Sequence, residues 1–263
     1  MTTANAGPSP STIYVAGVPL GYESSGDGKP LLVLPHETGR MGATELQRKL
    51  AANHRVVTPT LPGWDGTPRH EWMGSVRDMA ALLNLTLDKR DVDSVNLVGL
   101  GFGAWIAAEM ATMNQGRIAH LILVNPMGLQ PNDGEIMDQF LLGHEAYLQA
   151  GYHDLDRMAA NYSEGQPSID DLVEQDENRE MTARIAWKPY MFSQTLAQLL
   201  SEVRTPTRVL VSSDDQIVPA SCGQQYADAM PNATLARLED AGHFVEIEQP
   251  AALAQAISDF CAR

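Results

Sequence analysis

Short strand-forming runs alternate with longer helical runs along most of the chain, and this order limits the possible folds more than any other feature. In the first half, strand-type runs at 31–34, 55–58, 94–98 and 121–124 alternate with helical runs at 45–53, 75–87 and 104–113. Parallel strands need crossover connections, which helices usually supply, so this order predicts the α/β class with a mostly parallel sheet. Residues 11–22, interrupted near Gly17, predict an antiparallel hairpin in front of it.

The alternation stops after Gly128 and returns near residue 204. Helical patterns fill this interval, at 135–149, 154–162, 169–187 and 193–200. A strand at 208–211, a helix at 222–230, a strand at 234–238 and a helix at 251–261 then complete the chain. With 263 residues and 44% hydrophobic content, the chain is long enough for one domain with a sizeable core. We expect a core of residues 1–128 and 204–263 that carries a helical insertion at 129–203.

A glycine-rich turn joins the strand at 94–98 to the helix at 104–113. Its residues are Gly99, Leu100, Gly101, Phe102 and Gly103. A strand, a sharp turn and a helix with the pattern G-x-S-x-G make up a nucleophile elbow, in which a strained central serine stands above the sheet. Gly101 occupies the centre here, so the turn can form without supplying a hydroxyl.

Three further loops have recognisable composition and follow strand-type runs. They are His36-Glu37-Thr38-Gly39, the breaker-rich stretch 62–67, and the stretch 212–219 with Asp214 and Asp215. A fourth, 241–244, contains His243 and is followed by Glu248 and Pro250. In their order and spacing the four loops and the glycine turn resemble the α/β-hydrolase family over nearly the whole chain. The resemblance implies an eight-stranded, mostly parallel sheet flanked by helices, with a helical cap inserted after strand 6.

Position by position, the resemblance implies a catalytic pair. Asp215 corresponds to the acid, His243 to the base, and Gly101 to a vacant nucleophile position. An aspartate that holds one imidazole nitrogen leaves the other free as a general base, for which we expect a pKa near neutrality. The adjacent Asp214 is the competing acid, and we expect it to face solvent or cap a loop.

The oxyanion site implied by the resemblance consists of the backbone N–H groups of Thr38 and Phe102. Glu37 replaces the glycine that is usual in this loop. We expect its side chain to point into a neighbouring turn, and the alternative is that it acts as an acid beside the oxyanion site.

The pocket is expected between the top of the sheet and the cap. Its predicted lining combines polar loop residues with an aromatic and methionine cluster, of which about half could equally be cap core: His36, Glu37, Trp105, Trp187, Tyr190, Met191 and Phe192. Such a lining suits a small, largely apolar molecule with a carbonyl or hydroxyl group.

Three functions fit these residues. The favoured one is hydrolysis by water that the His243–Asp215 pair activates, with no serine nucleophile. The second is a cofactor-independent oxygenase or lyase that uses the same pair, and the third is a non-catalytic binding protein that keeps the pocket. We expect no cofactor and no metal ion, since Cys222 and Cys261 lie far apart without the spacing of metal ligands.

The formal net charge of −15 argues against nucleic acids and anionic membranes as partners, because both would repel such a surface. The first eight residues lack the basic and apolar regions of a targeting peptide, and no stretch of about 18 unbroken apolar residues follows. We therefore expect a cytoplasmic protein, a monomer or homodimer, whose partner is a small-molecule substrate.

Overall fold

The computed structural model describes residues 9–39, 44–162 and 164–262. Residues 1–8, on which the expectation about a targeting peptide bears, lie outside the described residues. Within this part of the chain the strands form one eight-stranded sheet in the order β1-β2-β4-β3-β5-β6-β7-β8. The strands are β1 (Ser9–Val15), β2 (Val18–Ser25), β3 (Lys29–Leu34), β4 (His54–Pro59), β5 (Val95–Leu100), β6 (Ile118–Val124), β7 (Thr207–Ser212) and β8 (Ala233–Leu238).

The predicted fold class is confirmed. Pairs β1–β2 and β2–β4 are antiparallel, and every other neighbouring pair in the sheet is parallel. Strand β5 is buried along its whole length, as expected for a central strand with helices on both faces. The predicted hairpin at the start of the chain is β1 and β2.

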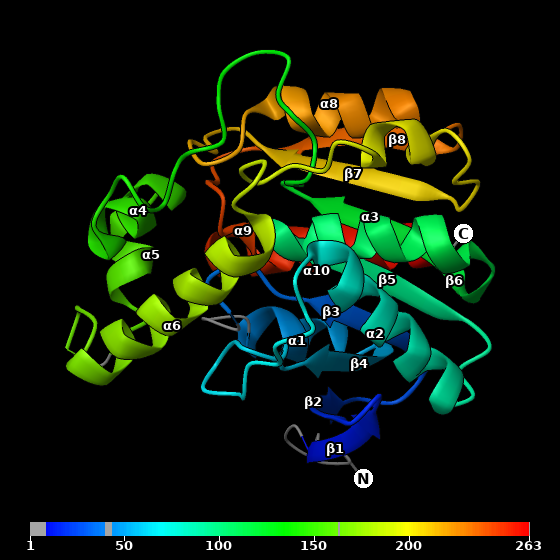
Figure 1. Cartoon of the computed structure of the whole chain (residues 1–263). Helices are drawn as coiled ribbons and strands as arrows, with labels where there is room; N and C mark the ends of the chain where they lie inside the picture. Colours follow the sequence, from blue (N-terminus) through cyan, green and yellow to red (C-terminus); the bar gives the residue numbers. More distant parts are fainter. Residues whose placement is uncertain (1–8, 40–43, 163, 263) are drawn as a thin grey trace, which may run out of the picture.

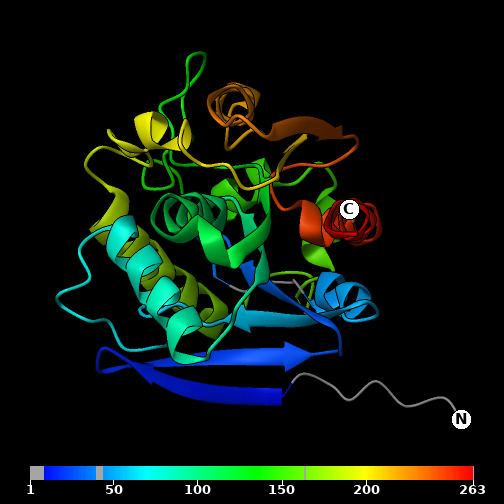
Figure 2. The ribbon, with the colours of Figure 1, turned by 90° about the vertical axis from the view of Figure 1, so that its right-hand side faces the viewer.

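Helices cover both faces of the sheet. The α-helices of the described residues are α1 (Thr44–Leu50), α2 (Val76–Lys89), α3 (Phe102–Asn114), α4 (His144–Gly151), α5 (Leu155–Ala159), α6 (Ile169–Ala186), α7 (Leu196–Leu200), α8 (Ala220–Ala229), α9 (Val245–Glu248) and α10 (Pro250–Cys261). Figure 2 shows α1 and α10 on one face and α2 and α3 on the other. Two clusters of buried hydrophobic side chains fill the spaces between these layers.

Helix α2 illustrates how the sequence sets these elements. The Ser75 side chain caps its first turn by accepting a hydrogen bond of 3.1 Å from the Asp78 amide. Val76, Met79, Leu83 and Leu87 follow at helical spacing and are all buried, so this face of α2 packs into the core.

The insertion between β6 and β7 contains α4 to α7. Helices α4, α5 and α6 lie together beyond one end of the sheet, on the left in Figure 1. The helix predicted at 135–149 begins only at His144, so the prediction was wrong for residues 135–143. There Asp138 accepts the Phe140 amide at 2.8 Å, and the Met137 amide donates to Ile217 O at 2.9 Å, which replaces a helical ladder.

The topology places four loops at one edge of the sheet. The loops after β3, β5 and β7 leave the carboxyl ends of parallel strands, and β8 leads to the loop of His243 at the same edge. Loops at the carboxyl ends of the strands form the usual ligand site of open α/β sheets.

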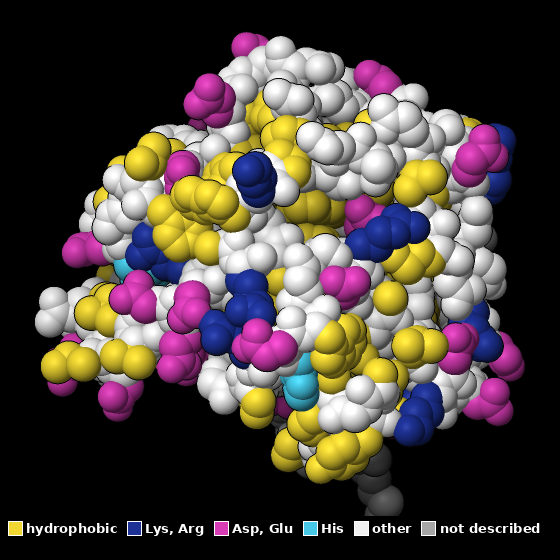
Figure 3. All heavy atoms as spheres, in the orientation of Figure 1, with side chains coloured by type: hydrophobic (Ala, Val, Ile, Leu, Met, Phe, Trp, Pro, Cys, Tyr) yellow, Lys and Arg dark blue, Asp and Glu magenta, His cyan; other side chains and the backbone are white. Residues whose placement is uncertain are grey.

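Acidic side chains are spread over the face shown in Figure 3, including the cap helices, as the net charge of −15 requires. None of the helices in the described ranges is both long and apolar enough to cross a membrane.

Candidate active site

Asp215 and His243 form a hydrogen-bonded pair. Asp215 Oδ2 lies 2.7 Å from His243 Nδ1, and Asp215 Oδ1 accepts the amides of Ile217 and Val218, both at 2.8 Å. The Asp215 side chain is 5% exposed and that of His243 is fully buried. Both carboxylate oxygens are thus occupied, which fixes the direction in which the imidazole points.

Asp214 faces another way. Its Oδ2 lies 3.2 Å from His153 Nδ1, and nearly half of its side chain is exposed. It also accepts a hydrogen bond from Ser213. Asp214 is therefore the solvent-facing member of the adjacent carboxylates, as the sequence suggests.

Glu37 does not point into a neighbouring turn, so that expectation was wrong. Its side chain is fully buried, with Oε1 3.8 Å from His243 Nε2 and 2.8 Å from the hydroxyl of Tyr147. The indole N–H of Trp64 donates to the Glu37 carbonyl at 2.9 Å and holds the backbone of the loop. The main chain is fixed from the core side, and the carboxylate is directed into the space in front of His243.

His36 lies beside the same space. Its Nε2 is 3.1 Å from Glu246 Oε2, its Nδ1 is 3.8 Å from Glu37 Oε2, and its ring meets that of His243 edge-on at 4.7 Å. The His36 side chain is 2% exposed and that of Glu246 is 3% exposed. Two imidazoles and three carboxylates, of Asp215, Glu37 and Glu246, are therefore packed together out of contact with bulk water.

These charges control protonation. Burial alone would lower the pKa of His243, but the carboxylates of Asp215 and Glu37 outweigh it and raise the pKa to about 10. The near-neutral pKa expected from sequence was wrong because two buried carboxylates, of Asp215 first and of Glu37 in addition, face the imidazole. Burial would raise the pKa of Glu37, but the imidazoles of His243 and His36 hold it well below the usual range.

Gly101 forms the turn between β5 and α3, with φ 50° and ψ −107°. This positive φ favours glycine. A Cβ atom built on Gly101 would lie 2.3 Å from His36 Nδ1 and 2.8 Å from His243 Nε2. The imidazole of His36 thus borders the space that a side chain at this turn would enter, too closely for a Cβ atom to fit.

Thr38 and Phe102 directly follow Glu37 and Gly101 in the chain. Phe102 is the first residue of α3, where backbone N–H groups have no partner within a helix. The turn of Thr38 is closed by a hydrogen bond of 3.1 Å from the Gly39 amide to His36 O, and Asn178 of the cap donates to Thr38 O at 3.0 Å. Their assignment to an oxyanion site stays a prediction.

The aromatic residues predicted to line the pocket form packing contacts of their own. Trp187 is 51% exposed, and its ring meets those of Phe140 and Tyr190 edge-on. The Tyr190 hydroxyl accepts the Gln139 amide and donates to Met137 O, both at 3.0 Å. Met191 and Phe192 run beside Gly128, and Trp105 is buried against Phe102. These contacts account for the packing of the cluster, and its role as a pocket wall stays a prediction.

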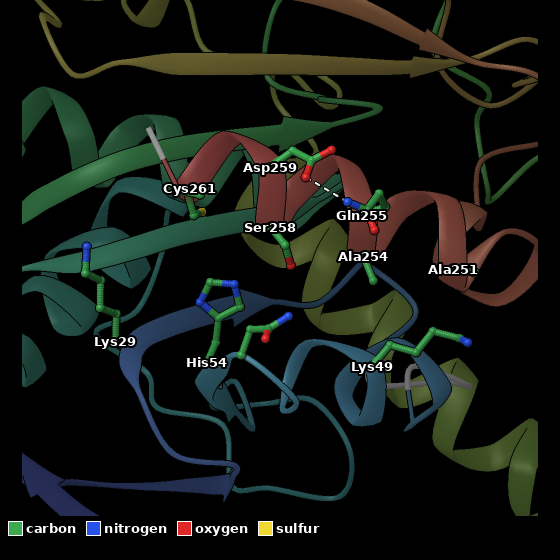
Figure 4. Close-up of a pocket in the computed structure, with 11 residues that line it drawn as sticks. Lys29, Lys49, His54, Ala251, Ala254, Gln255, Ser258, Asp259 and Cys261 are labelled. Atoms are coloured by element: carbon green, nitrogen blue, oxygen red, sulfur yellow. Dashed lines mark hydrogen bonds between the residues drawn. The ribbon is translucent and has the colours of Figure 1, made fainter.

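A cavity of about 720 Å³ lies at the opposite edge of the sheet, near the starts of β3 and β4. Figure 4 shows Lys29, Lys49 and His54 around it, facing α10. Because these residues are far along the strands from the four loops, this cavity is separate from the candidate site.

Sequence reasoning missed Glu246 and Tyr147. Glu246 lies three residues after His243, on the short helix α9, and this spacing could have drawn attention to it. Tyr147 comes from cap helix α4, and nothing in the sequence links it with Glu37, 110 residues away.

Comparisons with known proteins agree with this architecture. Residues 32–256 match the model of the alpha/beta hydrolase family. The chain is 25% identical over 266 residues to 2-hydroxy-6-oxononadienedioate/2-hydroxy-6-oxononatrienedioate hydrolase 2 of Pseudomonas putida, covering 92% of this chain and 91% of that protein.

Solved structures share the fold. A bacterial membrane phospholipase A superposes with a TM-score of 0.81 at 18% identity, over 97% of this chain and 86% of that chain. The meta-cleavage product hydrolase of Pseudomonas fluorescens IP01 superposes with a TM-score of 0.77 at 21% identity, over 95% of this chain and 96% of that chain. The chain belongs to the alpha/beta hydrolase family.

Proposed function

We propose that this protein is a hydrolase that cleaves a small carbonyl compound by direct attack of water, without a covalent serine intermediate. Gly101 stands where the family carries its serine nucleophile. The observation that carries the proposal is that Gly101 brings no side chain to the turn, and that His36, Glu37 and His243 meet in front of it.

The chemistry follows from the orientation of His243. Its Nε2 faces the space above Gly101, and Asp215 fixes its ring. The neutral imidazole takes a proton from water as the oxygen bonds to the carbonyl carbon, and returns it to the leaving group. Because the neighbouring carboxylates raise the pKa of His243 to about 10, the neutral form becomes more abundant as the pH rises, and we expect kcat to rise with pH toward that value. The N–H groups of Phe102 and Thr38 would stabilise the negative charge on the carbonyl oxygen.

The substrate class is suggested by relatives. Two proteins similar to this chain are named as a 2-hydroxy-6-oxononadienedioate/2-hydroxy-6-oxononatrienedioate hydrolase and a meta-cleavage product hydrolase. We therefore take small 2-hydroxy-6-oxo-2,4-dienoates as the first compounds to test, followed by aryl esters.

The test is turnover of these compounds by wild type and by His243→Ala. We expect His243→Ala to lower kcat about 10²–10⁴-fold, the usual contribution of a positioned base. The matched control is His153→Ala, a histidine 41% exposed beside Asp214, whose kcat should stay within about twofold of wild type. A ligand that binds but is returned unchanged by wild type would support the binding-protein alternative, and oxygen consumption during turnover would support the oxygenase.

A further inference from the structure

Three buried side-chain atoms converge on the space above Gly101 with no hydrogen-bond partner among the described residues. They are His36 Nδ1, Glu37 Oε2 and His243 Nε2. A ligand atom from each residue lies within 4.8 Å of the others, and the side chains are 0–2% exposed. A buried polar atom without a partner costs about 1–3 kcal/mol, so three of them around one point call for a ligand at that point.

A second layer of hydrogen bonds orients each of the three side chains. Asp215 lies 2.7 Å from the other ring nitrogen of His243, and Glu246 lies 3.1 Å from the other ring nitrogen of His36. Tyr147 donates to the second oxygen of Glu37 at 2.8 Å. Metal-binding histidines almost always have their second nitrogen held by a carboxylate, carbonyl or water, and binding carboxylates are hydrogen-bonded in turn.

The charges favour a cation. The carboxylates of Asp215, Glu37 and Glu246 surround the two imidazoles with little exposure to water. An imidazole must be neutral to bind a metal ion, so a divalent ion would take the place of the imidazole protons and balance these carboxylates in the buried site.

Gly101 keeps the space open. Any other residue would place its Cβ 2.3 Å from His36 Nδ1 and 2.8 Å from His243 Nε2, in the volume where an ion would be held. The glycine that removes the nucleophile is therefore also the residue that leaves room for the ion.

We propose that His36 Nδ1, Glu37 Oε2 and His243 Nε2 bind a divalent transition-metal ion above Gly101. Two imidazoles and one carboxylate with a position left for water is the ligand set of catalytic zinc sites, and it also suits Fe²⁺. Tetrahedral zinc needs ligand atoms about 3.4 Å apart, so the three side chains would close slightly around the ion.

This inference deepens the proposed function and rests on it for the role of the ion. The ion would take over the activation of the water from His243, which would hold the ion instead. Bound Zn²⁺ lowers the pKa of its water to about 7, so hydroxide forms at neutral pH as one proton leaves to solvent.

The experiment measures metal binding without any substrate. The purified protein is stripped with a chelator, incubated with Zn²⁺ or Co²⁺ and desalted, and bound metal is counted by mass spectrometry. The visible spectrum of the Co²⁺ form reports the ligand geometry. We expect one ion per chain in wild type, and loss of that ion in Glu37→Gln.

Asp215→Asn and His54→Asn complete the design. Asp215→Asn changes only the second layer, and should weaken binding about 10–100-fold. His54 is a histidine at the opposite edge of the sheet, so His54→Asn should keep one ion with the wild-type spectrum. Circular dichroism checks the fold of each variant, and Gly101→Ala, which fills the site from the other side, replaces Glu37→Gln if that variant does not fold.

Absence of bound Zn²⁺ and Co²⁺ in wild type, or retention of the ion in both folded Glu37→Gln and folded Gly101→Ala, would overturn the metal site. Turnover that persists in chelator-treated, metal-free protein would overturn the role of the ion while leaving the hydrolase proposal intact. A bound ion with no hydrolysis of any tested compound would count against the hydrolase proposal and leave the site standing.

Discussion

Gly101 shapes the site because it has no side chain, which leaves the position beside His36 and His243 open. Its backbone has the strained turn of an elbow, yet the imidazole of His36 borders the position where a Cβ would be. Introducing a serine by the single substitution Gly101→Ser should therefore fail to create a serine hydrolase, because the hydroxyl and His36 compete for one space.

The corresponding prediction compares two variants. Gly101→Ser alone should react very slowly with a fluorophosphonate, whereas Gly101→Ser with His36→Gly should be labelled about 10²-fold faster, the lower end of activation by a positioned base. Intact mass spectrometry follows the labelling. Fast, stoichiometric labelling of the single variant would show that His36 does not obstruct the turn.

A second residue-scale prediction concerns Tyr147. Tyr147→Phe removes the hydroxyl that donates to the buried Glu37 carboxylate, and should lower the free energy of unfolding by about 1.5–3 kcal/mol, as for other hydrogen bonds to charged groups. Tyr152→Phe is the matched control, because the Tyr152 hydroxyl accepts a hydrogen bond of 3.0 Å from the neutral amide of Asn161, and its loss should cost about 0.5–1.5 kcal/mol. Urea unfolding measures both, and equal losses would argue against an ionised Glu37.

Among the elements, α6 ties the cap to the core. Residues 169–174 of the helix are exposed, with Ile169 80% and Val173 55% accessible, whereas Asn178 is fully buried. Asn178 donates to Thr38 O at 3.0 Å and accepts the Asp65 amide at 2.8 Å, so one side chain holds two loops of the core.

We predict that Asn178→Ala lowers the free energy of unfolding by about 2–4 kcal/mol, since two backbone groups lose their partner. Glu177→Ala, one residue earlier on the exposed side of the same helix, should change it by no more than about 0.5 kcal/mol. Chemical denaturation provides both values. A loss in Asn178→Ala as small as in the control would mean that α6 is not anchored through this residue.

The elements also show what sequence can and cannot predict. The strands and the order of the loops follow from local patterns, because burial on both faces and crossover helices leave periodic signals. Residues 135–143 were wrongly predicted as helical because a hydrogen bond from the Met137 amide to the distant Ile217 carbonyl replaces the helix that the local pattern favours. The Glu37–Tyr147 contact joins the core to the cap, and only the folded chain brings these residues together.

For the whole molecule, the sequence predicted the sheet and the convergence of Asp215 and His243, but not the charge state of the site. The pKa of His243 depends on Glu37, whose direction is set by Trp64 and Tyr147. Because two side chains distant in the sequence set the direction of Glu37, the residues around Glu37 do not predict it.

Metal binding should stabilise the whole fold. A ligand that binds only the folded state at 100 times its Kd adds about 2.7 kcal/mol, which for a chain of this size raises Tm by roughly 5–10 °C. Wild type should show this rise between chelator and Zn²⁺, and Glu37→Gln should not. A rise of equal size in both proteins would place the stabilising ion elsewhere.

The central claim is that hydrolysis here proceeds without a covalent enzyme intermediate, and intact-protein mass spectrometry tests it most directly. Wild type is mixed with a 2-hydroxy-6-oxo-2,4-dienoate, or with an aryl ester if that is the compound turned over, and quenched in acid during the first turnovers. We expect product formation with no initial burst and an unchanged protein mass at every time point. A protein mass increased by the acyl group of the substrate, formed and lost at the rate of turnover, would contradict it.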